Sequence, residues 1–406
     1  MLKHWIWLTR CKGIGCITAK KLIKKFGSAE VIYALTWEHC REAGLSPKVA
    51  EAVMNKDMGD IEQVIEQCAR LRIRILTYGD SLYPERLRQI PDPPMVLYYK
   101  GTIPDVDREA TIAVVGTRSC SNYGMVQAKQ FSSLIALSGG IVVSGGARGI
   151  DTVALSSALS SIMPVICVLA GGLDDYYPRE NTGLFHFICE HGCLISEYPP
   201  GTQPRSTNFL ARNRLISGLS LGTLVVEAPR KSGSLTTASM ALHQNRDVYT
   251  IHRPDMGERC MGNEDLIASG CEAVKDGWEI MARYAHLYPD RILDGRTDEA
   301  AKRLQEIRCN NKYIIYSPVL TEQRGYCNPE APVNDTENTR YYGQASEFRL
   351  TEEEERIMNI LGVEPLDMDT IIARSGMSPS ETGMALTMLQ LKKRIIKNFG
   401  NSYQRL

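Results

Sequence analysis

Between residues 71 and 280, short apolar runs alternate with segments of helical length, and this alternation constrains the fold more than any other feature. Most runs are continuously apolar and rich in valine and isoleucine, which is typical of strands buried on both faces of a parallel sheet. The pattern predicts an α/β fold: a Rossmann-like, doubly wound, mostly parallel sheet with helices on both faces. The expected strands are 72–78, 111–116, 140–146, 164–172, 193–198, 222–228 and 247–252, and the expected helices include 122–137, 149–160, 211–220 and 234–245.

Three further regions flank this sheet domain. A chain of 406 residues is too long for one ordinary domain. Residues 1–70 resemble a set of short helices, 281–349 are largely polar and poor in periodicity, and 350–406 contain three helix-length segments and a β-like tail. Thr351 and Ser378 precede acidic residues at the spacing of helix N-caps. We therefore expect a small helical N-terminal domain, a Rossmann-like domain over 71–280, a partly disordered linker over 281–349 and a C-terminal winged-helix domain over 350–406.

Composition limits the environment and the partners. Lys and Arg together number 47, as do Asp and Glu, so a nucleic-acid binder must concentrate its positive charge locally. The 12 cysteines form no CxxC pair, which favours a reducing compartment. No apolar stretch approaches the roughly 18 residues of a membrane span, and the first residues lack a signal-peptide core. We expect a cytoplasmic protein that does not enter the membrane.

Glycines and basic side chains gather in the loops that follow the expected strands, which we call the crests. Ligands of open α/β sheets bind at this edge, where glycines let backbone N–H groups approach an anion. Arginines on several crests indicate a ligand with more than one phosphate, unless they pair with neighbouring acidic residues. The crests are 114–124, 143–151, 169–181, 196–214 and 226–238.

The anion is not predicted to be a dinucleotide. The first crest has no GxGxxG fingerprint, and no Walker A motif is present. Aromatic residues accompany the arginines and offer rings on which bases can stack, unless they only pack the loops. The crests therefore predict an extended single strand of nucleic acid. The aromatic residues are Tyr123, Tyr176, Tyr177, Tyr198 and Phe209.

These same loops resemble the DNA-processing protein A family, also called DprA or Smf. The blocks GTRSCSNYG, SGGARGID, GGLDDYYPREN, SEYPPGTQP, NFLARNRLISGLS and VVEAPRKSGSLTTA stand in the family's order and spacing, within a match over residues 72–275. The resemblance implies a dimeric, non-enzymatic protein without a cofactor. Such a protein binds and protects single-stranded DNA without strong sequence preference, and loads the RecA recombinase onto it in DNA uptake, natural transformation and recombination.

Carried over to matching positions, the resemblance implies a DNA pocket drawn from all five crests. Arg118 and Arg214 are expected at exposed loop ends. The chain departs from the family at Ser119–Ser121, at Gly146 and at residues 251–256, which leaves the shapes of these loops open. The implied DNA-binding residues are Gly116, Arg118, Arg148, Arg179, Phe209, Arg212, Asn213, Arg214, Ser232, Gly233 and Ser234.

The alternative function is a nucleotide-processing enzyme of the phosphoribohydrolase-like Rossmann group. Glu227 follows a buried strand and would be its acid or base, or else a partner for a nearby arginine. The residues before it, GLSLGTLVVE, lack the PGGxGTxxE signature of that group.

Four His and Cys residues between positions 186 and 193 could form a zinc site or could simply pack in the core. His186, Cys189, His191 and Cys193 are of zinc-ligand types, but they straddle a predicted helix end and strand start. Their side chains should therefore diverge, and we expect no metal.

The terminal domains carry weaker nucleic-acid signals. Residues 11–22 resemble a helix-hairpin-helix turn, whose backbone contacts phosphate without reading sequence. A structural hairpin with a solvated lysine face fits equally well. Near the C-terminus, Lys392, Lys393 and Arg394 are offset by the acidic run 352–355, so a protein-contact or regulatory module stays open. The lysines of the N-terminal hairpin are Lys12, Lys20, Lys21, Lys24 and Lys25.

Overall fold

The computed structural model describes residues 2–161, 163–300, 302, 350–362, 365–391, 394–398 and 402–405. The chain divides into two compact units, Met1–Glu306 and Ile307–Leu406. Most of the expected linker, residues 303–349, lies outside the described residues, as do Lys392 and Lys393.

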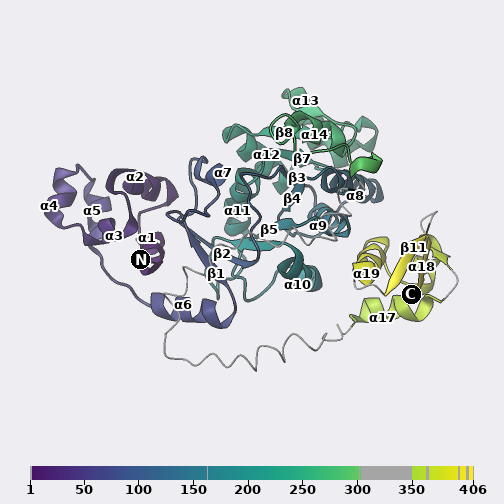
Figure 1. Ribbon diagram of the computed structural model, residues 1–406, viewed down its shortest axis with the longest axis horizontal. Helices are drawn as coiled ribbons and strands as arrows, with labels where there is room; N and C mark the ends of the chain where they lie inside the picture. Colours follow the sequence, from purple (N-terminus) through teal and green to yellow (C-terminus); the bar gives the residue numbers. More distant parts are fainter. Residues whose placement is uncertain are drawn as a thin grey trace. The chain divides into compact units, whose positions relative to one another are not determined.

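A nine-stranded sheet forms the centre of the first unit (Figure 1), in the order β1-β2-β6-β5-β4-β3-β7-β8-β9. The strands from β6 to β9 run parallel to their neighbours, whereas β2 is antiparallel to both β1 and β6. Every residue of β3, β4 and β5 is buried, as continuously apolar strands require. The bounds are β1 Arg74–Thr77, β2 Val96–Gly101, β3 Thr111–Val115, β4 Ile141–Ser144, β5 Val165–Leu169, β6 Cys193–Ser196, β7 Gly222–Val225, β8 Asp247–Thr250 and β9 Glu272–Ala273.

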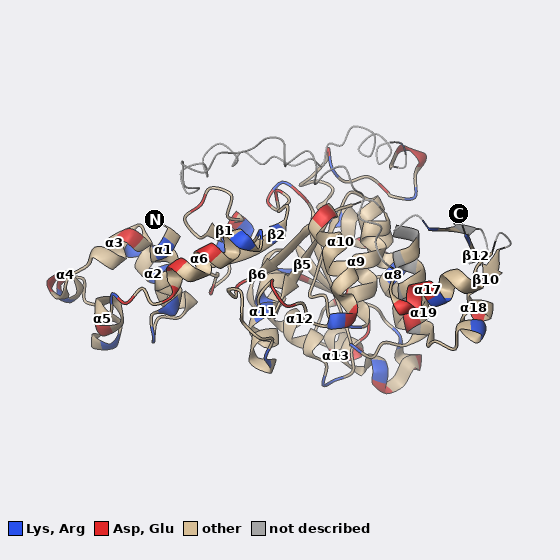
Figure 2. Ribbon diagram, turned by 90° about the horizontal axis from the view of Figure 1, so that it is seen from below, with Lys and Arg blue, Asp and Glu red and all other residues tan. Residues whose placement is uncertain are grey.

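Helices cover both faces of this sheet. From β3 the chain winds through β4 and β5 to β6, and α8, α9 and α10 lie on one face; it then returns to β7 and winds the other way, with α11 and α12 on the opposite face (Figure 2). The order reverses between β3 and β7, which is where open α/β sheets bind ligands. The predicted doubly wound, mostly parallel sheet is confirmed. The bounds are α7 Glu85–Arg88, α8 Asn122–Leu137, α9 Ile150–Ser160, η1 Arg179–Asn181, α10 Thr182–His191, α11 Ser206–Gly218, α12 Gly233–His243, η2 Pro254–Cys260, α13 Met261–Ala268 and α14 Gly277–Tyr284.

The sheet unit continues past residue 280, where the sequence suggests a linker. Helix α14 packs against α8, and Ile292 and Ala300 are buried. Arg291 lies 3.4 Å from the carboxylate of Glu109, just before β3. Residues 281–300 therefore belong to the packed unit, because apolar side chains among them are buried against it.

Six short helices precede the sheet and share its compact unit. Gly13, at φ +92°, turns the chain between α1 and α2 in a conformation that suits glycine. Large side chains such as Trp7, Leu8, Ile32 and Ile61 fill their core. The bounds are α1 Leu2–Arg10, α2 Cys16–Phe26, α3 Ala29–Ala34, α4 Trp37–Glu42, α5 Pro47–Met54 and α6 Ile61–Arg70.

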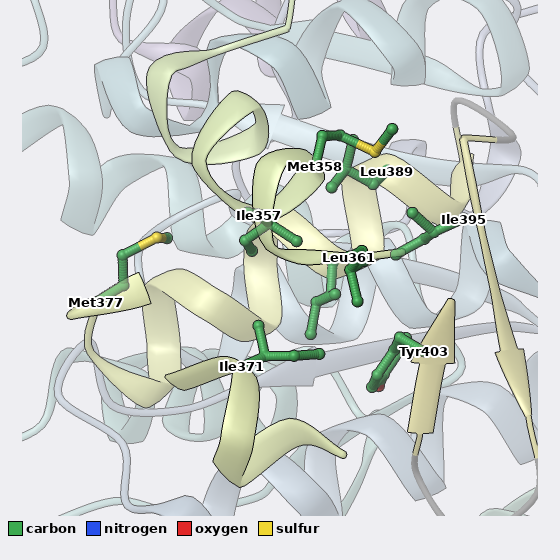
Figure 3. Close-up of a cluster of buried hydrophobic side chains, with 10 residues drawn as sticks. Ile357, Met358, Leu361, Ile371, Met377, Leu389, Ile395 and Tyr403 are labelled. Carbon is green, nitrogen blue, oxygen red and sulfur yellow. The ribbon is translucent and has the colours of Figure 1, made fainter. Parts of the chain in front are cut away.

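Among its described residues, the second unit contains three helices and a small antiparallel sheet, ordered β10-β12-β11. Its core gathers Ile357, Leu361, Ile371, Leu389 and Tyr403 (Figure 3). The expected N-caps are confirmed: the hydroxyl of Thr351 accepts from the Glu354 N–H, and that of Ser378 from the Glu381 N–H, both at 3.3 Å. The bounds are α17 Glu352–Ile360, β10 Leu366–Asp367, α18 Met368–Ser375, α19 Pro379–Leu391, β11 Ile395–Asn398 and β12 Ser402–Arg405.

No helix among the described residues is both long enough and apolar enough to span a bilayer.

Candidate nucleic-acid interface

Arg118, Phe209 and Tyr177 meet at the carboxyl edge of the sheet, and we call this cluster the crest platform. The Arg118 guanidinium carbon lies 4.8 Å from the centre of the Phe209 ring, and the Tyr177 and Phe209 ring centres are 5.8 Å apart. Arg118 is exposed, Tyr177 is 44% exposed and Phe209 is half-buried. The platform therefore offers solvent a cation beside aromatic rings, the combination that single-strand binders use for phosphates and bases.

Close packing of the first two crests positions Arg118. Gly149 has φ +77°, and a Cβ there would lie 2.5 Å from the carbonyl oxygen of Thr117. A Cβ at Gly116 would lie 2.5 Å from Ile150. Only glycines at these two positions let the loop after β3 lie directly against the start of α9.

The exposed arginines of the second and third crests lie on the same edge. Arg148 forms an ion pair with Glu180, but both side chains are more than half exposed, so the pair contributes little to stability. Arg179, also exposed, lines a surface hollow with Lys100, Tyr176 and two aspartates. Both guanidiniums can therefore turn to a phosphate at small cost.

Arg212 lies beneath the platform and is buried. Its guanidinium donates to the carbonyl oxygen of Gly145 at 2.6 Å and to that of Val168, and it lies 5.9 Å from the Phe209 ring centre. Asp151 is buried nearby and accepts from the Gly145 N–H at 3.1 Å. Burial raises the pKa of Asp151, while Arg212 acts in the opposite direction. Arg212 thus ties together the ends of β4 and β5.

The expectation that Arg214 sits at an exposed loop end is wrong. Helix α11 begins at Ser206 rather than 211, so Arg214 lies in its third turn and not at the helix start beside the loop, and it is 7% exposed. Its guanidinium pairs with Glu197 at 2.7 Å and Asp92 at 2.9 Å. Burial alone lowers the pKa of Arg214, but these partners raise it above its ordinary value. The sequence shows that Arg214 is charged, but it does not show that Asp92 and Glu197 lie against its guanidinium.

The last crest presents a helix start that is open to solvent. The Ser232 hydroxyl accepts from the Ser234 N–H at 3.3 Å, and the buried Asn213 amide donates to the Gly233 carbonyl at 3.3 Å. Gly233 is exposed, and the space where its Cβ would lie is open. Asn213 therefore links α11 to α12 from below, and in the Ser232–Ser234 turn Gly233 faces solvent whereas Ser234 is buried.

Glu227, the residue on which the enzyme alternative depends, is hydrogen-bonded to the first crest. Its carboxylate is buried and accepts from the Ser121 N–H at 3.1 Å and the Ser121 hydroxyl at 2.6 Å. Arg259 lies 3.8 Å away. A Cβ at Gly124 would lie 2.1 Å from this carboxylate, so the glycine makes room for it. Glu227 therefore holds the N-terminal end of α8 in place through its hydrogen bonds with Ser121.

The four side chains weighed as zinc ligands do not converge. Cys193 is buried in β6, Cys189 contacts the Tyr176 hydroxyl at 3.8 Å, and His191 packs on Phe187. Among the residues that the structure describes, no group of three His, Cys, Asp or Glu side chains is arranged to hold a metal ion.

A further cation at this edge, Arg253, is not among the residues predicted from sequence, although its aromatic partner Tyr123 is. Arg253 follows β8, and its guanidinium carbon lies 4.1 Å from the centre of the Tyr123 ring at the start of α8. Asp255 pairs with Arg253 at 2.6 Å. The rule that ligands bind beyond strand ends points to Arg253, but residues 251–256 lack the glycines that mark the other crests.

A family model described as DNA recombination-mediator protein A matches residues 74–285, just over half of the chain. The chain belongs to this family. A second model, the DprA winged helix domain, matches residues 344–400, and it confirms the predicted winged-helix domain.

The family relatives extend the match along the chain. Protein Smf of Synechocystis is 31% identical over 414 residues, covering 99% of this chain and 98% of the relative. DNA processing protein DprA of Streptococcus pneumoniae is 40% identical over 207 residues, covering 50% and 72%. The X-ray structure of DNA processing protein A from Streptococcus pneumoniae aligns with a TM-score of 0.61 at 30% identity, covering 70% of this chain and 98% of that chain.

Replacing a buried arginine should lower the stability of the protein far more than replacing an exposed one. Arg214→Ala leaves Glu197 partly buried without its partner, so the free energy of unfolding should fall by about 3–5 kcal/mol. Arg118→Ala removes an exposed side chain and should change it by less than about 0.5 kcal/mol. Urea unfolding followed by circular dichroism checks both variants. Equal losses would contradict the assignment of Arg214 as buried support.

Proposed function

We propose that this protein binds and protects single-stranded DNA, without strong sequence preference, at the crest platform. We propose further that it acts as a cytoplasmic homodimer that loads RecA recombinase onto the bound strand in DNA uptake, natural transformation and recombination. The observation that carries the proposal is the contact of Arg118 and Tyr177 with the Phe209 ring, among exposed cations on successive crests. Membership in a family whose relatives are named DNA processing proteins supports it.

Binding in this account has two sources. Exposed Arg118, Arg148 and Arg179 neutralise phosphates, and each phosphate neutralised releases condensed counterions. Tyr177 and Phe209 stack bases, at roughly 1–3 kcal/mol each. Every base has a face that stacks, so neither source distinguishes one sequence from another.

The other predicted residues serve the site indirectly. Arg212, Asn213 and Arg214 hold the crests in place through their buried hydrogen bonds, and Gly116 lets the first crest approach α9. Ser232 and Ser234 hold the turn at the start of α12, because their backbone N–H groups donate to the Pro229 carbonyl and the Ser232 hydroxyl. The exposed Gly233 between them would offer its N–H to a phosphate, where the helix dipole favours an anion. Binding without catalysis accords with Glu227, whose carboxylate is occupied by Ser121.

Charge reversal on the platform tests the site. Arg118→Glu should weaken binding of a single-stranded oligonucleotide by roughly tenfold to a hundredfold, the value of a charge-assisted contact. Fluorescence anisotropy at fixed salt measures the loss. Arg70→Glu is the matched control: Arg70 is exposed and precedes β1, at the opposite edge of the sheet from the crests. Equal affinities for the two variants would place the site elsewhere.

Recombinase loading has its own test. The protein should shorten the lag before RecA filaments form on a single strand already covered by a single-stranded-DNA-binding protein, because the platform can hold the strand while RecA nucleates. Arg118→Glu should lose this effect, whereas Arg70→Glu should retain it. An unchanged lag with the wild-type protein, while it still binds DNA, would remove RecA loading from the proposal and leave strand binding.

A further inference from the structure

Helix α2 of the N-terminal helices is fixed against the carboxyl end of β6. Cys16, the first residue of α2, lies 3.4 Å from the carboxylate of Glu197, which directly follows β6. Arg214 donates to the same carboxylate at 2.7 Å and lies 3.5 Å from the Cys16 sulfur. The start of α2 therefore stands beside the crest edge, and Arg214 joins the two regions.

A second anchor lies one turn further along α2. The ammonium group of Lys20 donates to the carbonyl oxygens of Arg88 and Ile90, each at 2.8 Å. Partial burial lowers the pKa of Lys20, which is thus engaged in packing and not available to a ligand. Two separate polar contacts fix both the position and the rotation of the helix.

This rotation turns a basic face of α2 to solvent. Ile17, Lys21 and Lys24 are spaced by four and three residues, so they share one side of the helix, and all three are exposed. Lys12 is exposed in the turn that precedes them. Among the described residues, no carboxylate lies within ion-pair distance of Lys12, Lys21 or Lys24. Arg148 on the second crest and Arg253 after β8 differ from these lysines, since each has an acidic partner.

A lysine face on an isolated helix is commonly just solvated. Two observations separate this one from that case: its cations lack acidic neighbours, and the anchors at Cys16 and Lys20 hold it at the crest edge. From Ile17 to Lys24 the helix rises about 10 Å, so the face offers exposed cations over that length from a start beside Glu197 at the crest edge. Cations on a helix that begins at a phosphate-binding edge suit the continuation of the same polyanion.

We infer that a bound single strand runs off the crests past β6 and continues over the α2 face formed by Lys12, Ile17, Lys21 and Lys24. The inference rests on the proposed function and enlarges its footprint. Arg214 then acts as a positioning residue: it holds α2 where the strand leaves the sheet and does not itself contact DNA. Short strands engage the crests alone, and longer strands engage both surfaces.

The test compares two strand lengths with one triple variant. Lys12→Gln, Lys21→Gln and Lys24→Gln together remove three charges and keep polar side chains that suit a helix surface. For an oligothymidylate of about 20 nucleotides, the plot of log affinity against log salt should become shallower by about 2, because each lost phosphate contact removes roughly 0.7. For one of about 6 nucleotides, affinity and slope should stay at the wild-type values.

The control triple carries Arg70→Gln, Arg72→Gln and Arg108→Gln, three exposed arginines that precede β1 or β3 at the opposite edge of the sheet. It loses the same net charge and should bind both lengths like the wild type. Thermal unfolding followed by circular dichroism verifies that both triples are folded.

The remaining outcomes separate this inference from the proposed function. If the lysine triple matches the control at both lengths, or weakens both lengths equally, the α2 face is not a continuation of the strand's path, while crest binding stands. A loss confined to duplex DNA would also overturn the inference. If the wild type binds neither strand, or Arg118→Glu binds both normally, the proposed function itself fails.

Discussion

The buried guanidinium of Arg212 is the interaction on which the crest edge depends. It donates to carbonyl oxygens at the ends of two adjacent strands, at Gly145 and Val168, and it lies under the Phe209 ring. A buried charge is tolerated only when its hydrogen bonds are made, and removing it takes a donor from both carbonyls and a nearby positive charge from the buried Asp151. The loops that carry the exposed arginines are therefore held in place before any ligand arrives.

The arginines that the family resemblance assigns to DNA binding have two different roles in this architecture. Arg118 and Arg179 face solvent, whereas Arg212 and Arg214 are enclosed by carbonyl oxygens and carboxylates. This division explains how a chain with balanced charges can offer a cationic edge. Asp92 and Glu197 pair with the buried Arg214, whereas the pair of Arg148 with Glu180 is exposed and screened by solvent. Arg118, Arg148 and Arg179 therefore keep their charges available where the strands end.

The sequence predicts the sheet well because buried parallel strands are continuously apolar. It does not predict β2, whose antiparallel run ends in Tyr98, Tyr99 and Lys100 and so lacks that pattern. The positions of the crests are also predictable, because ligands of open α/β sheets bind beyond the carboxyl ends of the strands, and the strands can be located in the sequence. The direction in which each crest side chain points cannot be predicted in this way. Arg214 meets Asp92, which lies 122 residues away, and no local signal reports that contact. The start of α11 is missed because Ser206, Thr207 and Asn208 are of polar, loop-forming types, and residues 206–210 are exposed or only partly buried, so they present no buried apolar face to the sequence pattern.

One measurement tests the central claim most directly: the affinity of the wild-type protein for a mixed-sequence single strand, for the matching duplex and for mononucleotides, over a range of salt concentrations. The account predicts that the single strand binds tightest and that its log affinity falls linearly with log salt, by roughly 0.7 for each phosphate contacted. An affinity independent of salt, an equal affinity for duplex, or release of base from the nucleotides would contradict it.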